Sequence, residues 1–368
     1  MVRRWRWLVV LAGVGVLLAL PSLVGLLPGR AAAVPATELL VRISRSASTP
    51  YSGYASATGG LALPVTGQLE SIAQLLGGST RMRVWWRSPA DWRVDSMTTT
   101  GETGQHRTSA GLWTWDYEDN RATVDRGPLD PPLRLPVAAD LLPSGLARRM
   151  LTDATSAEVT SLPARRVAGR DTQGLRLRPA DRRSTVNHVD VWADAQSGIP
   201  LRVDVVGADA PAPAMSSQFT DFSTVVPDAS VTAFFPPPSA RVRQRGGSDV
   251  AALLSRSGDV ARPATLAGLP RNDALRRDGV SGAYGRGVTQ LVAVPLSAGQ
   301  AGGLRRQLSA APGIADTAAG LSLSVGPLVL FLAKDDDHGT AWLLTGTVSA
   351  QTLTAGAEEL RHTSGVAS

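Results

Sequence analysis

Short runs in which apolar and polar residues alternate fill much of the chain between residues 81 and 223. Alternation over four to eight residues is typical of a half-buried β-strand, because successive side chains point to opposite faces of a sheet. The pattern predicts strands at 81–87, 91–97, 104–109, 111–117, 120–126, 165–170, 172–179, 186–194, 200–207 and 217–223. Turn residues such as Ser88-Pro89 and Gly111 separate the first of them, which favours antiparallel neighbours.

The first group of strands also carries five of the nine tryptophans. In the strand at 81–87, Met82, Val84 and Trp86 share one face. A row of large apolar side chains must be covered, either by helices or by a ligand. Two interpretations follow, a packed core or an apolar cavity that binds a ligand. The residues that would line such a cavity are Met82, Val84, Trp86, Trp92, Val94, Trp113, Trp115 and Tyr117.

Residues 59–80 interrupt the strand pattern with glycine and proline around a short helical piece. Four apolar side chains of that piece form a stripe, namely Leu69, Ile72, Leu75 and Leu76. They predict either a flap that closes over a cavity or a segment that packs permanently on the sheet.

Two helices and a second lobe complete the organisation. Residues 36–47 form an amphipathic pattern that Thr37 can cap, and a further helix is expected at 144–153. After a Pro-, Arg- and Gly-rich linker, the pattern predicts strands at 288–296, 321–325, 328–333 and 341–348, with helices at 301–310 and 350–361. Val329 to Leu332 is apolar on both faces, which indicates a central strand. We therefore divide the chain into a leader (1–33), a main domain (34–238), a linker (239–260) and a small α+β domain (261–368).

The leader indicates export. Basic residues precede the uncharged apolar stretch from Leu8 to Leu27, which is long enough to span ~30 Å of hydrocarbon. Ala31-Ala32-Ala33 then offers a site for signal peptidase. A cleaved signal peptide and an uncleaved membrane anchor both place the remainder outside the cytoplasm. The chain has no cysteine, so it forms no disulfide and cannot be acylated as a lipoprotein.

Charge excludes one class of partner. The formal net charge is +6, but residues 1–33 hold four arginines and no acidic residue. The remainder carries 33 basic against 31 acidic side chains, a net charge of +2. This balance lacks the basic footprint of a nucleic-acid-binding protein.

Catalytic and metal-binding motifs are absent from the sequence. None of the four histidines lies at metal-ligand spacing from another, and there is no nucleophile elbow or P-loop. We therefore predict no catalytic residue, no metal and no cofactor, and an envelope enzyme is disfavoured.

A series of short motifs in the second group of strands carries a family resemblance. They are Val167-Ala168-Gly169-Arg170, the run Leu175 to Pro179, Val191-Trp192-Ala193-Asp194, and Gly198-Ile199-Pro200-Leu201-Arg202. Residues 36–238 resemble the bacterial envelope superfamily that includes the lipoprotein carrier LolA and the sigma-E regulator RseB, also called MucB. Asp194 and Gly198 serve a turn in this pattern, so the shared motif is structural.

The resemblance implies an α+β fold in which a large, open antiparallel β half-barrel is covered by helices and followed by a smaller α+β domain. It implies a lipid or acylated ligand on the concave side and, for RseB-like members, a membrane-anchored anti-sigma factor as partner. We expect a non-enzymatic, membrane-associated regulator or sensor of the cell envelope. The alternative is a lipid or lipoprotein carrier. The chain departs from the family in that the 59–80 insertion is not part of the basic pattern. An uncleaved N-terminal anchor would be incompatible with a shuttling carrier.

Overall fold

The computed structural model describes residues 31–59, 78–97, 101–127, 136–208, 210–245, 263–273, 282–334 and 341–364. The apolar stretch of the leader and the four predicted flap residues Leu69, Ile72, Leu75 and Leu76 lie outside this part of the chain. Within it, every helix is too short or too polar to cross a membrane.

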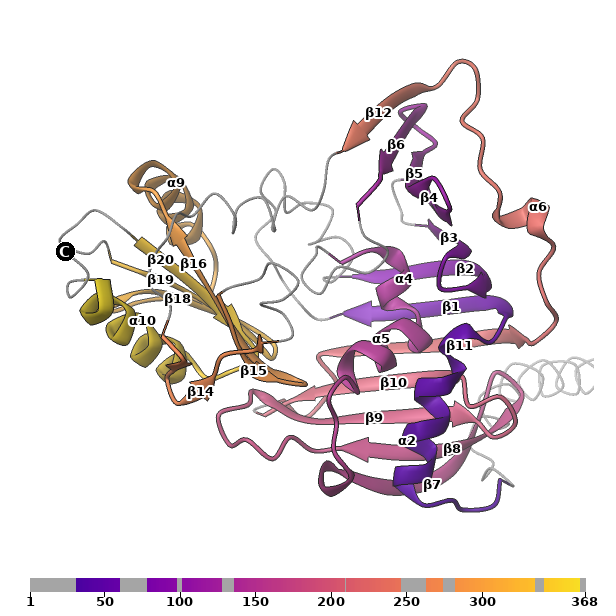
Figure 1. The fold of residues 1–368 in the computed structure, drawn as a ribbon, viewed down its shortest axis with the longest axis horizontal. Helices are drawn as coiled ribbons and strands as arrows, with labels where there is room; N and C mark the ends of the chain where they lie inside the picture. The colour runs from indigo at the N-terminus through magenta and orange to yellow at the C-terminus, as the bar shows by residue number, and fades with distance from the viewer. Residues whose placement is uncertain are drawn as a thin grey trace, which may run out of the picture.

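A 12-stranded sheet forms the main domain (Figure 1). Its strands are β1 (Tyr51–Gly59), β2 (Ser79–Ser88), β3 (Asp91–Met97), β4 (Glu102–Thr108), β5 (Gly111–Asp116), β6 (Arg121–Asp125), β7 (Val159–Val167), β8 (Arg170–Leu177), β9 (Val186–Asp194), β10 (Pro200–Gly207), β11 (Met215–Ser223) and β12 (Arg241–Arg245). The order is β12-β6-β5-β4-β3-β2-β1-β11-β10-β9-β8-β7, with no closure into a barrel. All neighbours are antiparallel except β12 and β6. The predicted α+β fold with a large open sheet is confirmed.

Helices cover one face of this sheet, which we call the inner face (Figure 1). They are α2 (Ala36–Arg45), α4 (Ala138–Leu141) and α5 (Pro143–Met150). The apolar stripe of α2 buries Leu39 and Ile43 against the core, as its periodicity predicts. The predicted cap by Thr37 is wrong, because α2 begins one residue earlier, at Ala36. The carbonyl of Pro35 accepts hydrogen bonds from the amides of residues 38 and 39 at 3.0 and 3.1 Å.

The turn between β9 and β10 confirms the structural role that the sequence motif predicts for Asp194. Its carboxylate accepts hydrogen bonds from the amide and hydroxyl of Ser197 at 2.8 and 2.7 Å. Gly198 has a φ of +72°, a left-handed conformation that glycine adopts without steric cost. Arg170 on β8 donates two hydrogen bonds to the same carboxylate, at 2.9 and 3.2 Å.

The chain after β11 is not simply a linker between the two lobes, although the sequence predicts a linker at 239–260. Residues 224–240, which we call the strap, include the short helix α6 (Ala229–Thr232) and lead into β12. The strap runs over the outer face, on the side of the sheet away from α4 and α5 (Figure 1). It ends where the amide of Arg241 donates to the carbonyl of Asn120 at 3.0 Å. β12 therefore extends the first sheet into the range predicted as linker, 239–260.

The second lobe is a six-stranded sheet between two helices. Its elements are β13 (Thr265–Leu266), β14 (Leu269–Pro270), β15 (Ala283–Arg286), β16 (Thr289–Leu296), α9 (Ala298–Ser309), β17 (Ile314–Asp316), β18 (Gly320–Val325), β19 (Leu328–Ala333), β20 (Ala341–Gly346) and α10 (Ala350–Ser364). The sheet order is β15-β16-β20-β19-β18-β17. Phe331 packs in the cluster that contains Leu353 of α10, and Leu332 packs in the cluster that contains Leu308 of α9. Both faces of β19 are buried, which confirms the predicted central strand.

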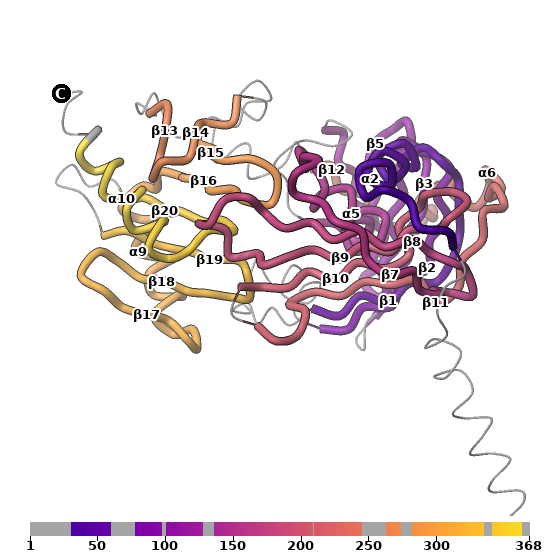
Figure 2. The backbone as a smooth tube through the Cα atoms, turned by 90° about the horizontal axis from the view of Figure 1, so that it is seen from below, coloured from indigo at the N-terminus to yellow at the C-terminus, as the bar shows by residue number. Residues whose placement is uncertain are grey.

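The two lobes lie side by side (Figure 2), and main-chain hydrogen bonds join them. The amide of Thr185 donates to the carbonyl of Thr347, and the amide of Ser349 donates to the carbonyl of Arg183, both at 3.0 Å. The guanidinium of Arg183 also reaches the carbonyl of Ala267 at 2.8 Å. The loop before β9 thus docks on the second lobe as a short antiparallel pair.

Candidate functional site

The register of β2 to β5 places the predicted ligand-binding residues on opposite faces of the sheet. Trp86 pairs with Trp92, and Trp92 pairs in turn with Arg107, so these three side chains share the inner face. The adjacent residue His106 pairs with Trp113, so both lie on the outer face. Met82, Val84, Trp86, Trp92 and Val94 are on the inner face, and Trp113, Trp115 and Tyr117 are on the outer face. One cavity lined by all eight residues, as the sequence suggested, is not formed.

The inner-face aromatic residues form a packed stack. Trp86 lies parallel to Tyr51 and to Trp92, with ring centroids 5.9 and 5.8 Å apart. The hydroxyl of Tyr51 is 2.6 Å from that of Ser144 on α5, and burial raises the pKa of this tyrosine. Arg148, also on α5, places its guanidinium 5.7 Å from the Trp86 ring, at cation–π distance. The five predicted residues on this face are at most 5% exposed, so the helices and the sheet enclose them as core.

The outer face holds a second aromatic cluster, into which the strap inserts Phe234. The Phe234 ring lies 4.7 Å from His106, 5.4 Å from Trp113 and 6.2 Å from Trp115, measured between centroids. Thr232 precedes it and is 1% exposed. The strap itself therefore covers part of the aromatic surface for which the sequence allowed either a packed core or a ligand-binding cavity.

His106 links the strap to the sheet through a hydrogen bond. Its Nδ1 lies 3.2 Å from the carbonyl oxygen of Thr232. A carbonyl can only accept, so Nδ1 carries the proton of the ring. Burial lowers the pKa of His106, and the Thr232 carbonyl offsets only part of this effect. The ring is therefore neutral near pH 7.

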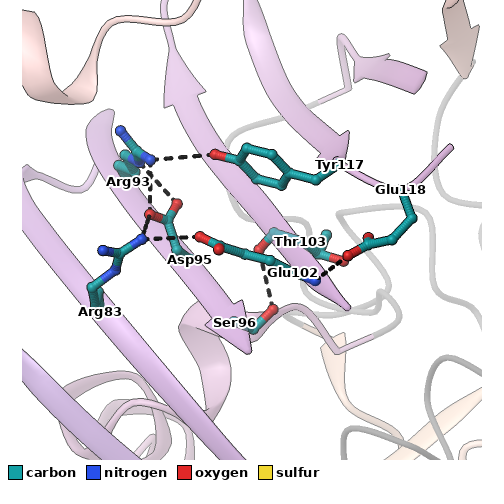
Figure 3. Close-up of polar contacts among 8 residues, drawn as sticks. All are labelled: Arg83, Arg93, Asp95, Ser96, Glu102, Thr103, Tyr117 and Glu118. Carbon is teal, nitrogen blue, oxygen red and sulfur yellow. Dashed lines mark hydrogen bonds and ion pairs between the residues drawn. The ribbon is translucent and has the colours of Figure 1, made fainter. Parts of the chain in front are cut away.

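A charged cluster adjoins these aromatic residues on the outer face (Figure 3). Asp95, whose side chain is fully buried, accepts two hydrogen bonds from Arg93, both at 2.8 Å. Arg83 bridges Asp95 at 3.3 Å and Glu102 at 3.0 Å. Arg93 also donates to the hydroxyl of Tyr117 at 3.4 Å. Cross-strand pairs of opposite charge stabilise antiparallel sheets, and this cluster ties β2, β3 and β4 together.

The chemistry of this cluster is that of a structural ion-pair network. Burial alone would lower the pKa of Arg93, but its hydrogen bonds to Asp95 outweigh burial and raise it. Burial and the charge of Asp95 raise the pKa of Tyr117. Arg93, Asp95 and Tyr117 are thus joined by an ion pair and hydrogen bonds on the outer face of the sheet. In the described ranges, no three His, Asp or Glu side chains gather closely enough to hold a metal ion.

The interpretation of the sequence missed both this cluster and the strap. A signal for the cluster exists, since Arg83 and Asp95 occupy polar positions of two consecutive predicted strands, and Glu102 lies two residues before the third. No such signal exists for Phe234, because its contacts with β4 and β5 span more than 100 residues.

Two hollows lie elsewhere in the described residues. One, of about 280 Å³, is lined by Arg42, Arg45, Ser46, Thr49, Gln196, Ser197 and Gly198. The other, of about 310 Å³, lies between the lobes and is lined by Glu158, Ala180, Asp181, Leu269, Pro270, Gly285, Arg286 and Thr289. Neither is lined by a predicted ligand-binding residue.

An ion pair crosses the hollow between the lobes. The two terminal nitrogens of the Arg286 guanidinium, Nη1 and Nη2, donate to the Glu158 carboxylate at 3.1 and 3.0 Å. Burial would raise the pKa of Glu158, but the hydrogen bonds from Arg286 and from the amides of Thr155 and Ala180 outweigh it. They lower the pKa from 4.5 to about 2. The pair joins the main domain to β15 of the second lobe.

Docking of the lobes should therefore depend on pH in the acid range. A lowered carboxylate pKa contributes stability that is complete above the ordinary value of about 4.5 and is lost as the pH falls through about 2. Between pH 5 and pH 2 we expect the melting temperature of the wild type to fall further than that of Glu158→Gln. Scanning calorimetry of both proteins checks this, and parallel curves would contradict it.

Comparisons with known proteins give one family match. Residues 135–228, which run from just before α4 through β11, match the family model of the MucB/RseB N-terminal domain. No curated protein matches the sequence.

Solved structures give matches of low identity. A structure of the Pseudomonas aeruginosa MucA/MucB complex is 17% identical, covers 89% of this chain and 96% of its own, and has a TM-score of 0.45. A structure of MucB in complex with MucA(peri) is 16% identical, covers 88% and 97%, and has a TM-score of 0.46. A LolA superfamily protein from Nitrosomonas europaea is 11% identical, covers 55% and 99%, and has a TM-score of 0.26.

Proposed function

From the match of residues 135–228 to the MucB/RseB N-terminal domain, we propose that this chain is a non-enzymatic regulator of the cell envelope. It acts outside the cytoplasm and binds a membrane-anchored protein of the anti-sigma-factor type, together with a lipidic ligand. The family match is the observation that carries this proposal. Two properties of the sequence agree with it, namely a leader of the kind that directs export and the lack of a catalytic motif.

We assign partner binding to the second lobe. The matched segment contains Glu158 and the loop at Arg183 and Thr185, which hold that lobe in place. A partner bound by the second lobe is thereby coupled to the sheet and to its covering helices. This arrangement suits a sensor, in which a ligand at one site changes binding at another.

Deletion of residues 249–368 tests this assignment. We expect the shortened chain to lose capture of the anti-sigma factor of the native host, measured by co-purification of the tagged chain. The Arg286→Glu variant, which keeps the lobe but opposes Glu158, is expected to weaken capture less than the deletion. Unchanged capture by a folded deletion variant would contradict the assignment.

We place the lipidic ligand between the sheet and α5, on the inner face. The lining there is apolar and includes Trp86 and Val94, as acyl chains require. These side chains are core in the present structure, so a ligand enters only when α4 and α5 move outward. α4 is four residues long and α5 eight, so short helices provide this part of the cover.

Substitutions on the two faces should then have different effects on lipid capture. Leu146 of α5 is buried against the inner face, with 5% of its surface exposed, whereas Trp113 lies on the outer face. We expect Leu146→Glu to abolish lipid capture and Trp113→Asp to retain it. Native mass spectrometry and organic extraction of each folded variant, recovered from the envelope with its own leader, measure this. Loss only in Trp113→Asp would move the ligand to the outer face, and a lipid-free wild type would contradict lipid binding.

A further inference from the structure

β12 is the last strand at one end of the 12-stranded sheet that the described residues form. On one side it pairs with β6, through five residue pairs in unbroken register from Arg241 to Arg245. Among the described strands none pairs with its other side. An unpaired edge presents free amides and carbonyls to any extended chain of suitable chemistry.

The backbone of β12 shows which groups are free. The amide of Arg241 donates to Asn120 on the β6 side. In a parallel ladder the residues of one strand alternate between the two sides, so residues 241, 243 and 245 bond to β6. The amides and carbonyls of Val242 and Gln244 therefore point outward, and they can form hydrogen bonds with a further strand.

The side chains of β12 select the kind of strand that can pair. The sequence from 241 to 245 is Arg-Val-Arg-Gln-Arg, so Arg241 and Arg243 share one side of the strand and Val242 lies on the other. Arg241, Val242 and Arg243 are exposed, Val242 by 50%. A second copy of this edge would bring arginine beside arginine, which is repulsive. An acidic strand would bring opposite charges together.

The other edge of the sheet is protected. β7 contains Pro163, which has no amide hydrogen, and its register with β8 is broken between Leu162 and Arg165. Proline and bulges prevent edge pairing with any chain, whereas charged side chains such as those of Arg241 and Arg243 oppose pairing with a chain of like charge. Between Arg241 and Arg245, β12 has neither a proline nor a bulge.

We infer that β12 is a docking edge for an extended acidic segment of another protein, which adds to the sheet as a thirteenth strand. Acidic side chains of that segment face Arg241 and Arg243, and its alternate apolar side chains lie beside Val242. This surface is separate from the inner face and from the second lobe, so it does not depend on the function proposed above.

A labelled synthetic peptide tests the inference on the full-length chain. The probe is a fluorescent eight-residue peptide that alternates Asp and Val, and the control peptide alternates Asn and Val. The matched variants are Val242→Pro, which removes an outward amide and no bond to β6, and Val242→Thr, which keeps it. Fluorescence anisotropy at low and high salt gives the affinities, and circular dichroism confirms the fold of each variant.

We expect the Asp peptide to bind wild type and Val242→Thr equally. Val242→Pro should weaken it about tenfold, because a carbonyl of the peptide loses its donor. High salt should also weaken binding, because exposed charges are screened. Three results would each overturn the inference: equal binding of the Asn peptide, full affinity in Val242→Pro, or no binding to the wild type. Equal binding of phosphatidylglycerol vesicles by wild type and Val242→Pro, without peptide binding, would assign the arginines to a membrane surface instead.

Discussion

Asp95→Asn is expected to lower the free energy of unfolding by about 3 kcal/mol. The side chain of Asp95 is fully buried and accepts hydrogen bonds from Arg83 and Arg93. The asparagine amide keeps the shape but removes the charge, and it turns an N–H₂ donor toward the guanidinium donors. Removing one partner of a buried ion pair leaves the other charge uncompensated, which costs more than the pair itself contributes. Denaturant titration followed by tryptophan fluorescence measures the change.

Asp91→Asn is the matched control for this substitution. Asp91 also binds an arginine, with 2.7 Å between its carboxylate and Nε of Arg87, but its side chain is 39% exposed. Solvent screens an exposed pair, so its loss should cost at most about 1 kcal/mol. Equal losses for the two variants would show that the outer-face cluster has no more effect than a surface ion pair.

Phe234→Ala is expected to lower the free energy of unfolding by about 2 kcal/mol, because it removes a half-buried ring and three aromatic contacts. His106, Trp113 and Trp115 lose the ring that covers them. Water then reaches the two indoles, so their fluorescence should shift to longer wavelength. Amides of the strap should exchange faster with solvent, which hydrogen-exchange mass spectrometry measures.

The adjacent residue provides the control. Phe235 is 86% exposed, so Phe235→Ala should change stability by less than about 0.5 kcal/mol. The two substitutions have identical chemistry and differ only in where the ring lies. If both variants keep native stability and slow exchange, the strap is not held by Phe234.

Much of the fold follows from periodicity, because local pattern determines local structure. The pattern predicted β2 to β6 and β8 to β11 of the main domain and β16, β18, β19 and β20 of the second lobe, and the stripe of Leu39 and Ile43 predicted α2. The strand predicted at 165–170 is wrong, because these residues form the end of β7 and the turn into β8, and the sequence did not predict β13, β14, β15 or β17. The apolar run at Val329 to Leu332 predicted a strand with two covered faces, and helices lie on both sides of β19.

The relation between strands did not follow from the pattern. Alternation determines which residues share a face within a strand, but the connection between two strands decides which faces align. The connection from β3 to β4 places Trp92 opposite Arg107 rather than His106. This one-residue difference puts Trp113 on the face opposite to Trp92, so residues that look equivalent in the sequence belong to two separate clusters.

β12 was missed for a different reason. Its composition, Arg-Val-Arg-Gln-Arg after a proline run, is typical of a linker. The strand forms because residues 241–245 meet β6, more than 100 positions earlier in the chain. Contacts at such separation depend on the path of the strap, which local periodicity does not encode.

The most direct test of the proposed function is to identify what the chain binds in its native envelope. A tagged full-length chain would be expressed with its own leader, cross-linked reversibly in cells and purified, and its partners identified by mass spectrometry. We expect a membrane-anchored protein of the anti-sigma-factor type, captured by the wild type and lost on deletion of residues 249–368. Capture of acylated proteins or lipid alone, unaffected by that deletion, would contradict it and favour a carrier.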